Sequence, residues 1–503
     1  MKKLLGTTLA LALILPLGQV NASEFFKNMK FSGQLDLQGT SANNVTDFQT
    51  RHSHQGNTVG VAGSTSGRDR MSDMQTRVMI SMDWDLLDDV HSRVTLTKRN
   101  RAWGDPASNT AGETLTVVQG AITADEANVK IDKVFGAIDT TLGRQFYGTA
   151  GDLMVYYGPN DKALYGMTVT ALDSARFDWS GESAYLTALF GNTNAHALGA
   201  VGATGRQEVR GLVLGTKGME NVAASAYVWN MLTHNQALGV GVAPTSAGNP
   251  GDKNDNLYVF GVKVKVKAEN AWLAGEIAKN YGSQRNANGT TQVAPARNYI
   301  GWGFLLDAGI KADIEGLGAL TPWGQFAYGT GDQNTRESQN RGFQTINSDY
   351  RPGAIYGRFS DVIGGSAFGN GIGLAAGTLN QRGLNNRIIW GGGLKVTPAA
   401  VNKLTVGASY WDFKLQSRVF GPNTNPIALG NKNIGSEADL DFSWAHSENV
   451  TLALGGGMFF PGGLIKEQIQ TNNINGTNPN SQKGNSPAQL AYFDVRVKWG
   501  GAQ

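Results

Sequence analysis

The segment Met29-Lys30-Phe31-Ser32-Gly33-Gln34-Leu35-Asp36-Leu37-Gln38 alternates between apolar or small residues and polar residues. Successive side chains of a β-strand point to opposite sides, so the odd-numbered residues share one face and the even-numbered residues share the other. The segment therefore predicts a strand with one apolar face and one polar face.

The same period of two recurs along the chain, for example from Thr76 to Trp84, from Tyr258 to Val266 and from Phe493 to Trp499. Helical periodicity is weak, and the content of β-branched, aromatic and glycine residues disfavours long helices. We predict eighteen strands, at residues 29–40, 74–86, 90–101, 127–135, 137–147, 174–180, 183–191, 207–217, 221–233, 256–267, 271–281, 297–309, 319–330, 386–397, 403–415, 436–447, 450–460 and 489–499.

The connections between these strands alternate between long and short. Long polar stretches such as 41–73, 102–126 and 331–385 alternate with tight turns such as the one around Leu87-Asp88-Asp89. This alternation is typical of outer-membrane barrels, in which long loops face outside and short turns face the periplasm. Leu164 to Leu172 is apolar enough for a further strand, but we assign it to the third long loop, folded inward.

The composition limits the alternatives. The chain has 503 residues, 67 of them glycine and none of them cysteine, which excludes a lipid anchor, disulfides and thiolate metal sites. Residues 1–22 resemble a secretory signal, with a basic start, an apolar run and small residues before Ala22, and the alternative is a retained anchor. The 43 basic and 40 acidic residues nearly balance, which gives no reason to expect a nucleic-acid partner.

Residues 23–503 are thus expected to form one all-β domain, a transmembrane antiparallel up-and-down β-barrel of about eighteen strands. Lys263, Lys265 and Lys267 share one strand face and could not lie in a dry core, but they can line water. A sheet in a bilayer must close on itself because no backbone group can remain unpaired there. Tryptophans expected in the interfacial girdles are Trp84, Trp229, Trp272, Trp390, Trp444 and Trp499.

Several segments together resemble the alginate-export family of outer-membrane channels. They are Thr141-Leu142-Gly143-Arg144-Gln145, Phe326-Ala327-Tyr328-Gly329-Thr330-Gly331-Asp332, Phe343, Tyr356-Gly357, Gly435-Ser436-Glu437-Ala438-Asp439-Leu440 and Met458-Phe459-Phe460-Pro461-Gly462. The resemblance implies an eighteen-stranded porin that exports an anionic polysaccharide. One departure is that Gly500-Gly501-Ala502-Gln503 follow Trp499, whereas outer-membrane barrels usually end on an aromatic residue that the assembly machinery reads.

Barrels of 16–18 strands leave an aqueous channel, so we expect a porin that passes polar, anionic solutes by diffusion. Selectivity in a pore comes from rings of charge. The basic residues expected to line the lumen and set selectivity are Arg77, Arg93, Arg144, Lys263, Lys265, Lys267, Arg387, Arg496 and Lys498. Their expected ion-pair partners in the lumen are Asp83, Glu437 and Asp439. If every basic residue were paired, little net electrostatic field would remain in the lumen. Loop 331–385 forms either a constriction or a solvated outer loop.

Other functions remain as alternatives. The barrel could sheathe a periplasmic multihaem cytochrome as an electron conduit. No enzyme is expected, because no Ser-His pair with an orienting partner can be placed. His52 and His54 could bind a metal weakly, but no metal site or cofactor is predicted. The expected partners are outer-membrane lipid and lipopolysaccharide, a small polar or polyanionic solute, and the outer-membrane assembly machinery.

Overall fold

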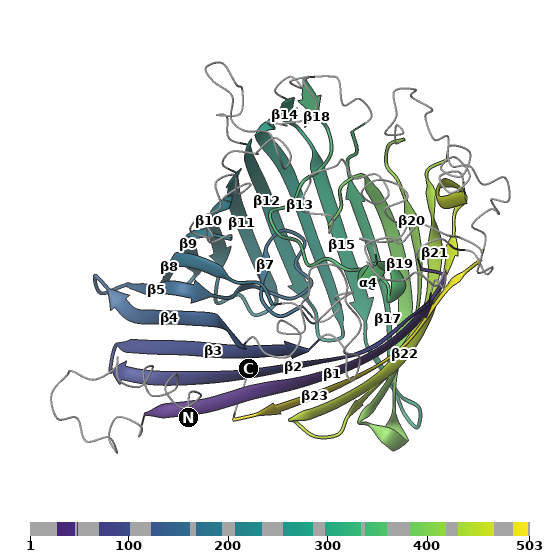
Figure 1. The fold of residues 1–503 in the computed structure, drawn as a ribbon, viewed down its shortest axis with the longest axis horizontal. Helices are drawn as coiled ribbons and strands as arrows, with labels where there is room; N and C mark the ends of the chain where they lie inside the picture. Colours follow the sequence, from purple (N-terminus) through teal and green to yellow (C-terminus); the bar gives the residue numbers. More distant parts are fainter. Residues whose placement is uncertain are drawn as a thin grey trace, which may run out of the picture.

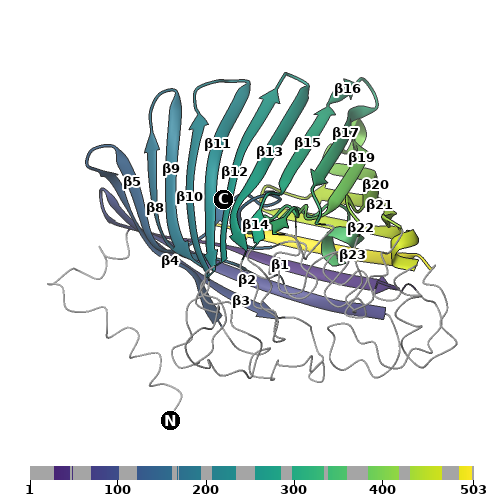
Figure 2. The same ribbon diagram turned by 90° about the horizontal axis from the view of Figure 1, so that it is seen from above.

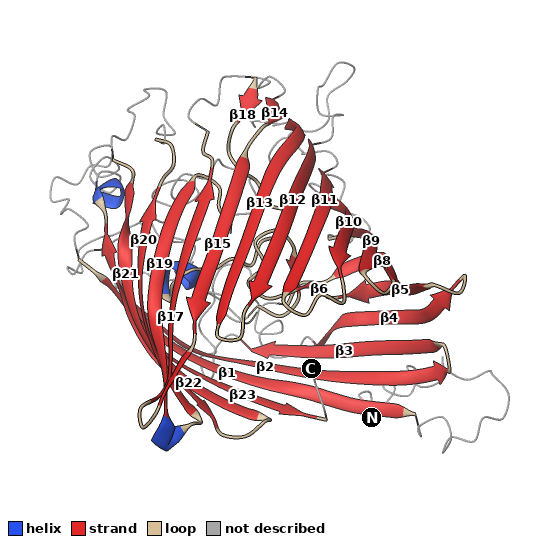
Figure 3. Ribbon diagram, turned by 180° about the vertical axis from the view of Figure 1, so that it is seen from behind, coloured by secondary structure: helices blue, strands red, loops and turns tan. Residues whose placement is uncertain are grey.

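The structure, a computed structural model, describes residues 28–45, 48, 70–100, 122–160, 167, 169–193, 207–233, 255–284, 297–332, 338–359, 383–418, 431–466 and 486–500. Eighteen strands form one continuous wall (Figures 1 and 3). They are β1 (Met29–Asn43), β2 (Arg70–Leu87), β3 (Val90–Asn100), β4 (Ile122–Val134), β5 (Ile138–Gln145), β8 (Leu172–Ser180), β9 (Ala184–Asn192), β10 (Gln207–Thr216), β11 (Val222–Thr233), β12 (Asp255–Lys267), β13 (Ala271–Gln284), β15 (Trp302–Ile310), β17 (Gly318–Gly329), β19 (Arg387–Pro398), β20 (Leu404–Lys414), β21 (Asn433–Ala445), β22 (Val450–Pro461) and β23 (Ala488–Trp499).

The wall closes into a barrel. Each wall strand pairs antiparallel with the next one along the chain, and β23 pairs antiparallel with β1 from Gly33↔Trp499 to Asn43↔Gln489. Figure 2 shows β1 and β23 side by side. Closure leaves no free sheet edge, which is the condition for a sheet to cross a bilayer.

The two faces of the wall differ in chemistry, as the alternation predicted. The outer face presents large apolar side chains, including Phe31, Phe190, Leu214, Ile277 and Leu454, with exposed fractions above 50 %. The inner face carries most of the charged side chains, among them Asp36, Arg77, Glu276 and Glu437. The helices within the described ranges are all too short and too polar to cross a membrane.

The apolar core lies inside the barrel, where two chain segments fold inward. The first spans residues 146–160, with β6 (Tyr147–Gly148) paired to β7 (Tyr156–Tyr157), and the second spans residues 338–359, with β18 (Gln339–Asn340) and α4 (Ile355–Phe359). We call them the first and second inward segments. Val155 and Asn347 join them in a parallel bridge, and the Tyr156 amide donates to the Asn347 carbonyl at 2.8 Å.

All eighteen predicted strands have a counterpart in the barrel wall. The one predicted at 297–309 is divided into β14 (Arg297–Tyr299), which pairs in parallel with β18, and β15. The break falls at Gly301, where a Cβ would lie 2.6 Å from the Gly342 carbonyl oxygen, so the second inward segment approaches too closely for a side chain. A further short strand, β16 (Ala312–Ile314), pairs with β17, and the 3₁₀ turn η3 (Ala399–Val401) follows β19.

Two smaller expectations fall in the connections or beyond the described residues. Leu172 begins β8, and the described residues before it, 169–171, form no strand of the wall, so the assignment of that stretch to a loop is confirmed where it can be followed. The signal peptide at 1–22 and the histidines His52 and His54 lie outside the described residues.

The girdle assignment is wrong for two tryptophans. Trp229 faces inward, is 3 % exposed and packs edge-on against Tyr147 with ring centroids 5.4 Å apart. Trp272 also faces inward, and its Nε1 donates to Asp307 Oδ1 at 2.5 Å. Both were assigned from their position near a strand end, but the strand face on which each lies points to the lumen. Trp390 and Trp499, by contrast, are exposed on the outer face.

Candidate functional site

The first inward segment is held to the wall through Asp152. Its Oδ1 accepts the backbone amides of Met154 at 2.7 Å and Val155 at 3.1 Å, and its Oδ2 pairs with Lys263 on β12. Lys263 also lies 3.6 Å from Glu276 Oε2 on β13, whose Oε1 accepts the hydroxyl of Tyr227 at 2.6 Å. These groups form one connected network, so Lys263 fixes the segment in place.

Arg77 of β2 holds the first inward segment to another part of the wall. Its Nε and Nη2 donate to Asp36 Oδ2 at 2.9 and 2.7 Å, and its Nη1 donates to the carbonyls of Asn160 and Met167. Arg496 of β23 donates to the other oxygen of Asp36 at 2.7 Å. One carboxylate thus joins the first, second and last wall strands, and Arg77 is wholly buried beneath the segment.

The second inward segment is held by Glu437 on β21. Its two carboxylate oxygens accept the backbone amides of Ile355 at 2.6 Å and Tyr356 at 2.9 Å, at the start of α4. Tyr356 stacks on Phe413 with ring centroids 4.0 Å apart, and its hydroxyl accepts from Arg387 Nε at 2.7 Å. Burial raises the pKa of Tyr350 in the same segment, so its hydroxyl stays protonated and donates to Gln325 Oε1 at 2.7 Å.

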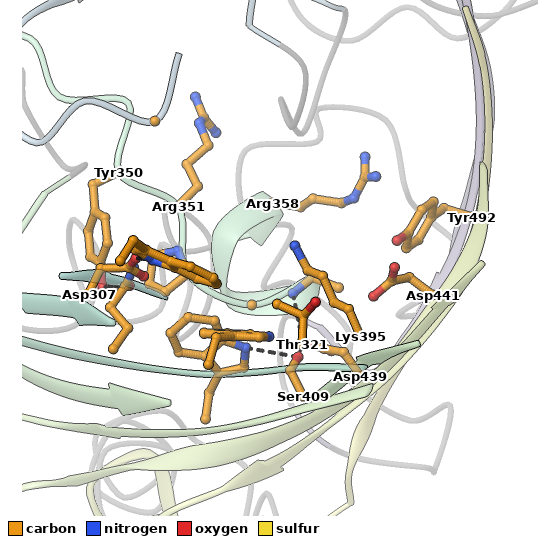
Figure 4. A pocket seen from close by; sticks show the side chains of 18 residues that line it. Asp307, Thr321, Tyr350, Arg351, Arg358, Lys395, Ser409, Asp439, Asp441 and Tyr492 are labelled. Carbon is orange, nitrogen blue, oxygen red and sulfur yellow. Dashed lines mark hydrogen bonds between the residues drawn. The ribbon is translucent and has the colours of Figure 1, made fainter. Parts of the chain in front are cut away.

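A cavity of about 480 Å³ lies between residues 350–358 of the second inward segment and the wall (Figure 4). Trp323 and Trp411 form part of its lining, with ring centroids 5.4 Å apart. The charged groups that reach it include Asp307, Asp441, Lys395 and Arg358, which Figure 4 shows around its rim. A volume in this range is typical of sites for small molecules.

Comparison with known proteins shows the fold. OccAB2 of Acinetobacter baumannii superimposes with a TM-score of 0.53 at 10% sequence identity, over 94% of this chain and 98% of that one. OccK9 (OpdG) of Pseudomonas aeruginosa superimposes with a TM-score of 0.50 at 9% identity, over 94% and 100%. The chain has the barrel fold of outer-membrane porins.

At the level of sequence, no protein-family model matches the chain. No curated protein matches it either. The resemblance to the alginate-export family therefore stays a prediction, while the barrel that this resemblance implied is present.

The structure places all of the predicted basic residues except Arg144 inside the barrel, and four of them are in ion pairs. Arg93 lies 3.4 Å from Asp83 and 3.4 Å from Glu126, and Lys263, Arg77 and Arg496 are paired as described above. Arg387 is buried against the second inward segment. Lys265, Lys267 and Lys498 have no ion-pair or hydrogen-bond partner for their side chains among the residues that the structure describes.

Arg144 does not line the lumen. It pairs with Asp173 at 3.3 Å, and both side chains lie on the outer face, which they share with the exposed side chains of Leu142 and Phe177. The next residue on each strand, Gln145 and Leu172, is buried on the inner side. Arg144 has the same parity as Leu142, so it shares the outer face with that residue and its assignment to the lumen was wrong.

The two acidic residues predicted on β21 have other partners than expected. Glu437 binds backbone amides and makes no ion pair within the described ranges. Asp439 accepts the Ala354 amide at 3.2 Å and the Ser409 hydroxyl at 3.3 Å. Both therefore bind the second inward segment or its surroundings, whereas Asp83 pairs with the predicted base Arg93.

Sequence reasoning placed Asp36 on the polar face of its strand, but it missed Asp152, Trp323 and Trp411 as parts of the lumen. A signal for the tryptophans does exist in β19, where Gly391, Gly392 and Gly393 follow one another. A Cβ at Gly391 would lie 2.1 Å from the Trp411 ring, and one at Gly393 would lie 2.9 Å from Trp323 Nε1. The glycines make room for two indoles that come from the strands on either side.

Proposed function

We propose that the protein is a channel of the bacterial outer membrane through which small polar solutes diffuse. The observation that carries this proposal is the division of the closed wall into an apolar outside and a charged inside. An apolar exterior of this extent is stable against lipid, and the charged side chains of the interior are stable where they are paired or meet water. The long connections would then face outside the cell and the short turns the periplasm.

The interior favours small solutes over a polymer. Two inward segments cross the lumen and are fixed to the wall by buried contacts at Arg77, Asp152 and Glu437. A polysaccharide chain would have to displace at least one of them, whereas a small sugar or organic ion would not. The alginate-export type of cargo is therefore the less favoured version of the proposal.

We attribute a preference for anions to lysines rather than arginines. Arg77, Arg93 and Arg496 are neutralised by neighbouring carboxylates, which leaves little field for a passing ion. Lys265, Lys267 and Lys498 lie on the inner face without an ion-pair partner in the described part of the chain, and they would attract anions into the lumen.

Recording in planar lipid bilayers tests both parts of the proposal. The wild-type protein should give an open conductance, and a salt gradient should give a reversal potential on the anion side. Replacing Lys265, Lys267 and Lys498 by glutamate should move that potential toward cation preference. The conservative triple replacement by arginine is the control and should leave it in place. A sealed barrel would refute the channel and favour a sheath for a partner, and an unmoved potential would refute the lysine assignment.

A further inference from the structure

The cavity under the second inward segment contains two opposite charges that do not pair with each other. Lys395 of β19 and Asp441 of β21 both line it, and neither side chain has an ion-pair or hydrogen-bond partner among the described residues. Three further charged groups of the cavity have partners: Arg351 pairs with Asp349, Asp307 accepts from Trp272 and Gln325, and Asp439 accepts from the Ala354 amide and the Ser409 hydroxyl.

The strand register places these two charges at one level of the wall. Lys395 pairs with Gly407 of β20, and Gly407 pairs with Asp441. The two residues are thus separated by two strand spacings, about 10 Å at the backbone. A Cβ at Gly407 would lie 2.4 Å from Asp441 Oδ1, so the carboxylate leans across the glycine toward the strand of Lys395.

A second cationic group is available on the lysine side of the cavity. Arg358 of α4 is buried, stacks 4.5 Å from the ring centroid of Tyr492 and donates from Nη2 to Asp494 at 3.4 Å. Its Nε and Nη1 have no hydrogen-bond partner within the part of the chain described. Figure 4 shows its side chain at the rim between Lys395 and Tyr492. A buried guanidinium with free donors is costly unless something binds there.

The lining next to these charges is aromatic. Trp323 lies over Gly393, one level from Lys395 along the strands, and Trp411 lies over Gly391, two levels from Lys395. Indole rings favour the apolar body of a small solute and are also good partners for an organic ammonium group.

We propose that this cavity is a binding site for a compact zwitterion, with its carboxylate at Lys395 and Arg358 and its ammonium group at Asp441. Such a solute compensates both free charges in one step. A simple anion would be repelled by Asp441, and a simple cation would be repelled by Lys395 and Arg358. The inference rests on the proposed channel and names one class of solute that would pause in it.

Three solutes with the same carbon chain separate these cases: 4-aminobutyrate, butyrate and butylamine. Calorimetric titration of the detergent-purified barrel should show that 4-aminobutyrate binds about tenfold or more tightly than either single-charge analogue, because each analogue lacks one of the two charge-assisted contacts. Lys395→Ala and Asp441→Ala should each abolish the preference, whereas Lys395→Arg should keep it. Lys403→Ala, at an exposed lysine between η3 and β20 that does not line the cavity, is the matched control and should change nothing.

Butyrate binding as tightly as 4-aminobutyrate would overturn the inference, as would a preference that survives both alanine substitutions. Bilayer recording separates this failure from failure of the channel. An open conductance without zwitterion preference refutes only the site, and preferential binding by a barrel that conducts nothing refutes only the channel.

Discussion

Asp36 illustrates what a single residue contributes to this barrel. It is 4 % exposed and lies between Arg77 and Arg496, which approach it from the strands on either side. A buried carboxylate of this kind is tolerated because two guanidinium groups and the Gln34 amide satisfy its oxygens. Removing it would take two charge-assisted hydrogen bonds from the wholly buried Arg77.

We therefore predict that Asp36→Ala lowers the free energy of unfolding by about 3–5 kcal/mol, the range seen when one partner of a buried ion pair is removed. Urea titration, followed by the shift in gel mobility that distinguishes folded from unfolded barrels, measures the effect. Asp88→Ala removes an exposed carboxylate in the β2–β3 turn and should be neutral. Equal stability of the two variants would mean that the ion pair does not stabilise the barrel.

Single residues also show where prediction from sequence ended. The alternation correctly placed Arg77, Arg93 and Arg496 on the inner face, because that property belongs to one strand. Their partners were not predictable, since Asp36 meets Arg496 only after the first and last strands close the ring. Arg144, by contrast, has the parity of the apolar Leu142, so the alternation of its own strand indicates the outer face.

Among the elements, the second inward segment is the one that most directly restricts the lumen. Its turn at residues 351–358 lies over the cavity, and Glu437 holds it through two amides of the chain. A Cβ at Gly353 would lie 2.8 Å from Glu437 Oε1, so the turn fits closely around the carboxylate. Few other groups could replace this contact.

We predict that Glu437→Ala raises the single-channel conductance, because a turn without its anchor leaves the lumen part of the time. Glu437→Gln keeps one acceptor oxygen and should give an intermediate value. Asp83→Ala removes a lumen carboxylate that pairs with Arg93 and does not hold the turn. This variant should leave the conductance unchanged. If Glu437→Ala conducted like the wild type, the turn would not be what limits the current.

The elements differ in how far the sequence predicts them. A strand of the wall is specified by its own alternation, since each of its faces meets one uniform environment. The inward segments carry no such period, and their conformation depends on wall residues distant in the sequence, such as Asp152 meeting Lys263 and Ile355 meeting Glu437. Loop 331–385 could therefore be nominated as a constriction, but the contacts that make it one could not be derived.

At the scale of the whole molecule, the barrel is turned inside out relative to a soluble protein. Large apolar side chains such as Leu454 and Ile277 are exposed on the outside, while the polar groups converge on the interior. In water this outer surface would promote aggregation, since soluble proteins rarely expose apolar patches of that extent. In a bilayer the same surface stabilises the fold, and the closed ring of strand pairs leaves no backbone group facing lipid unpaired.

Two adjacent positions on β22 test this arrangement. Leu454 lies on the outer face near the middle of the strand, and its neighbour Ala453 points inward, level with Asp494. We predict that Leu454→Lys destabilises the folded barrel in lipid bilayers by about 2–4 kcal/mol, the cost of a charge near the bilayer midplane, as measured by urea unfolding in vesicles. Ala453→Lys should cost little, because its ammonium group meets water and a carboxylate. The two substitutions add the same side chain one residue apart, so strand propensity cannot explain a difference between them. Equal costs would mean that the two faces of the wall meet the same environment, and the channel proposal would then fail together with the membrane location.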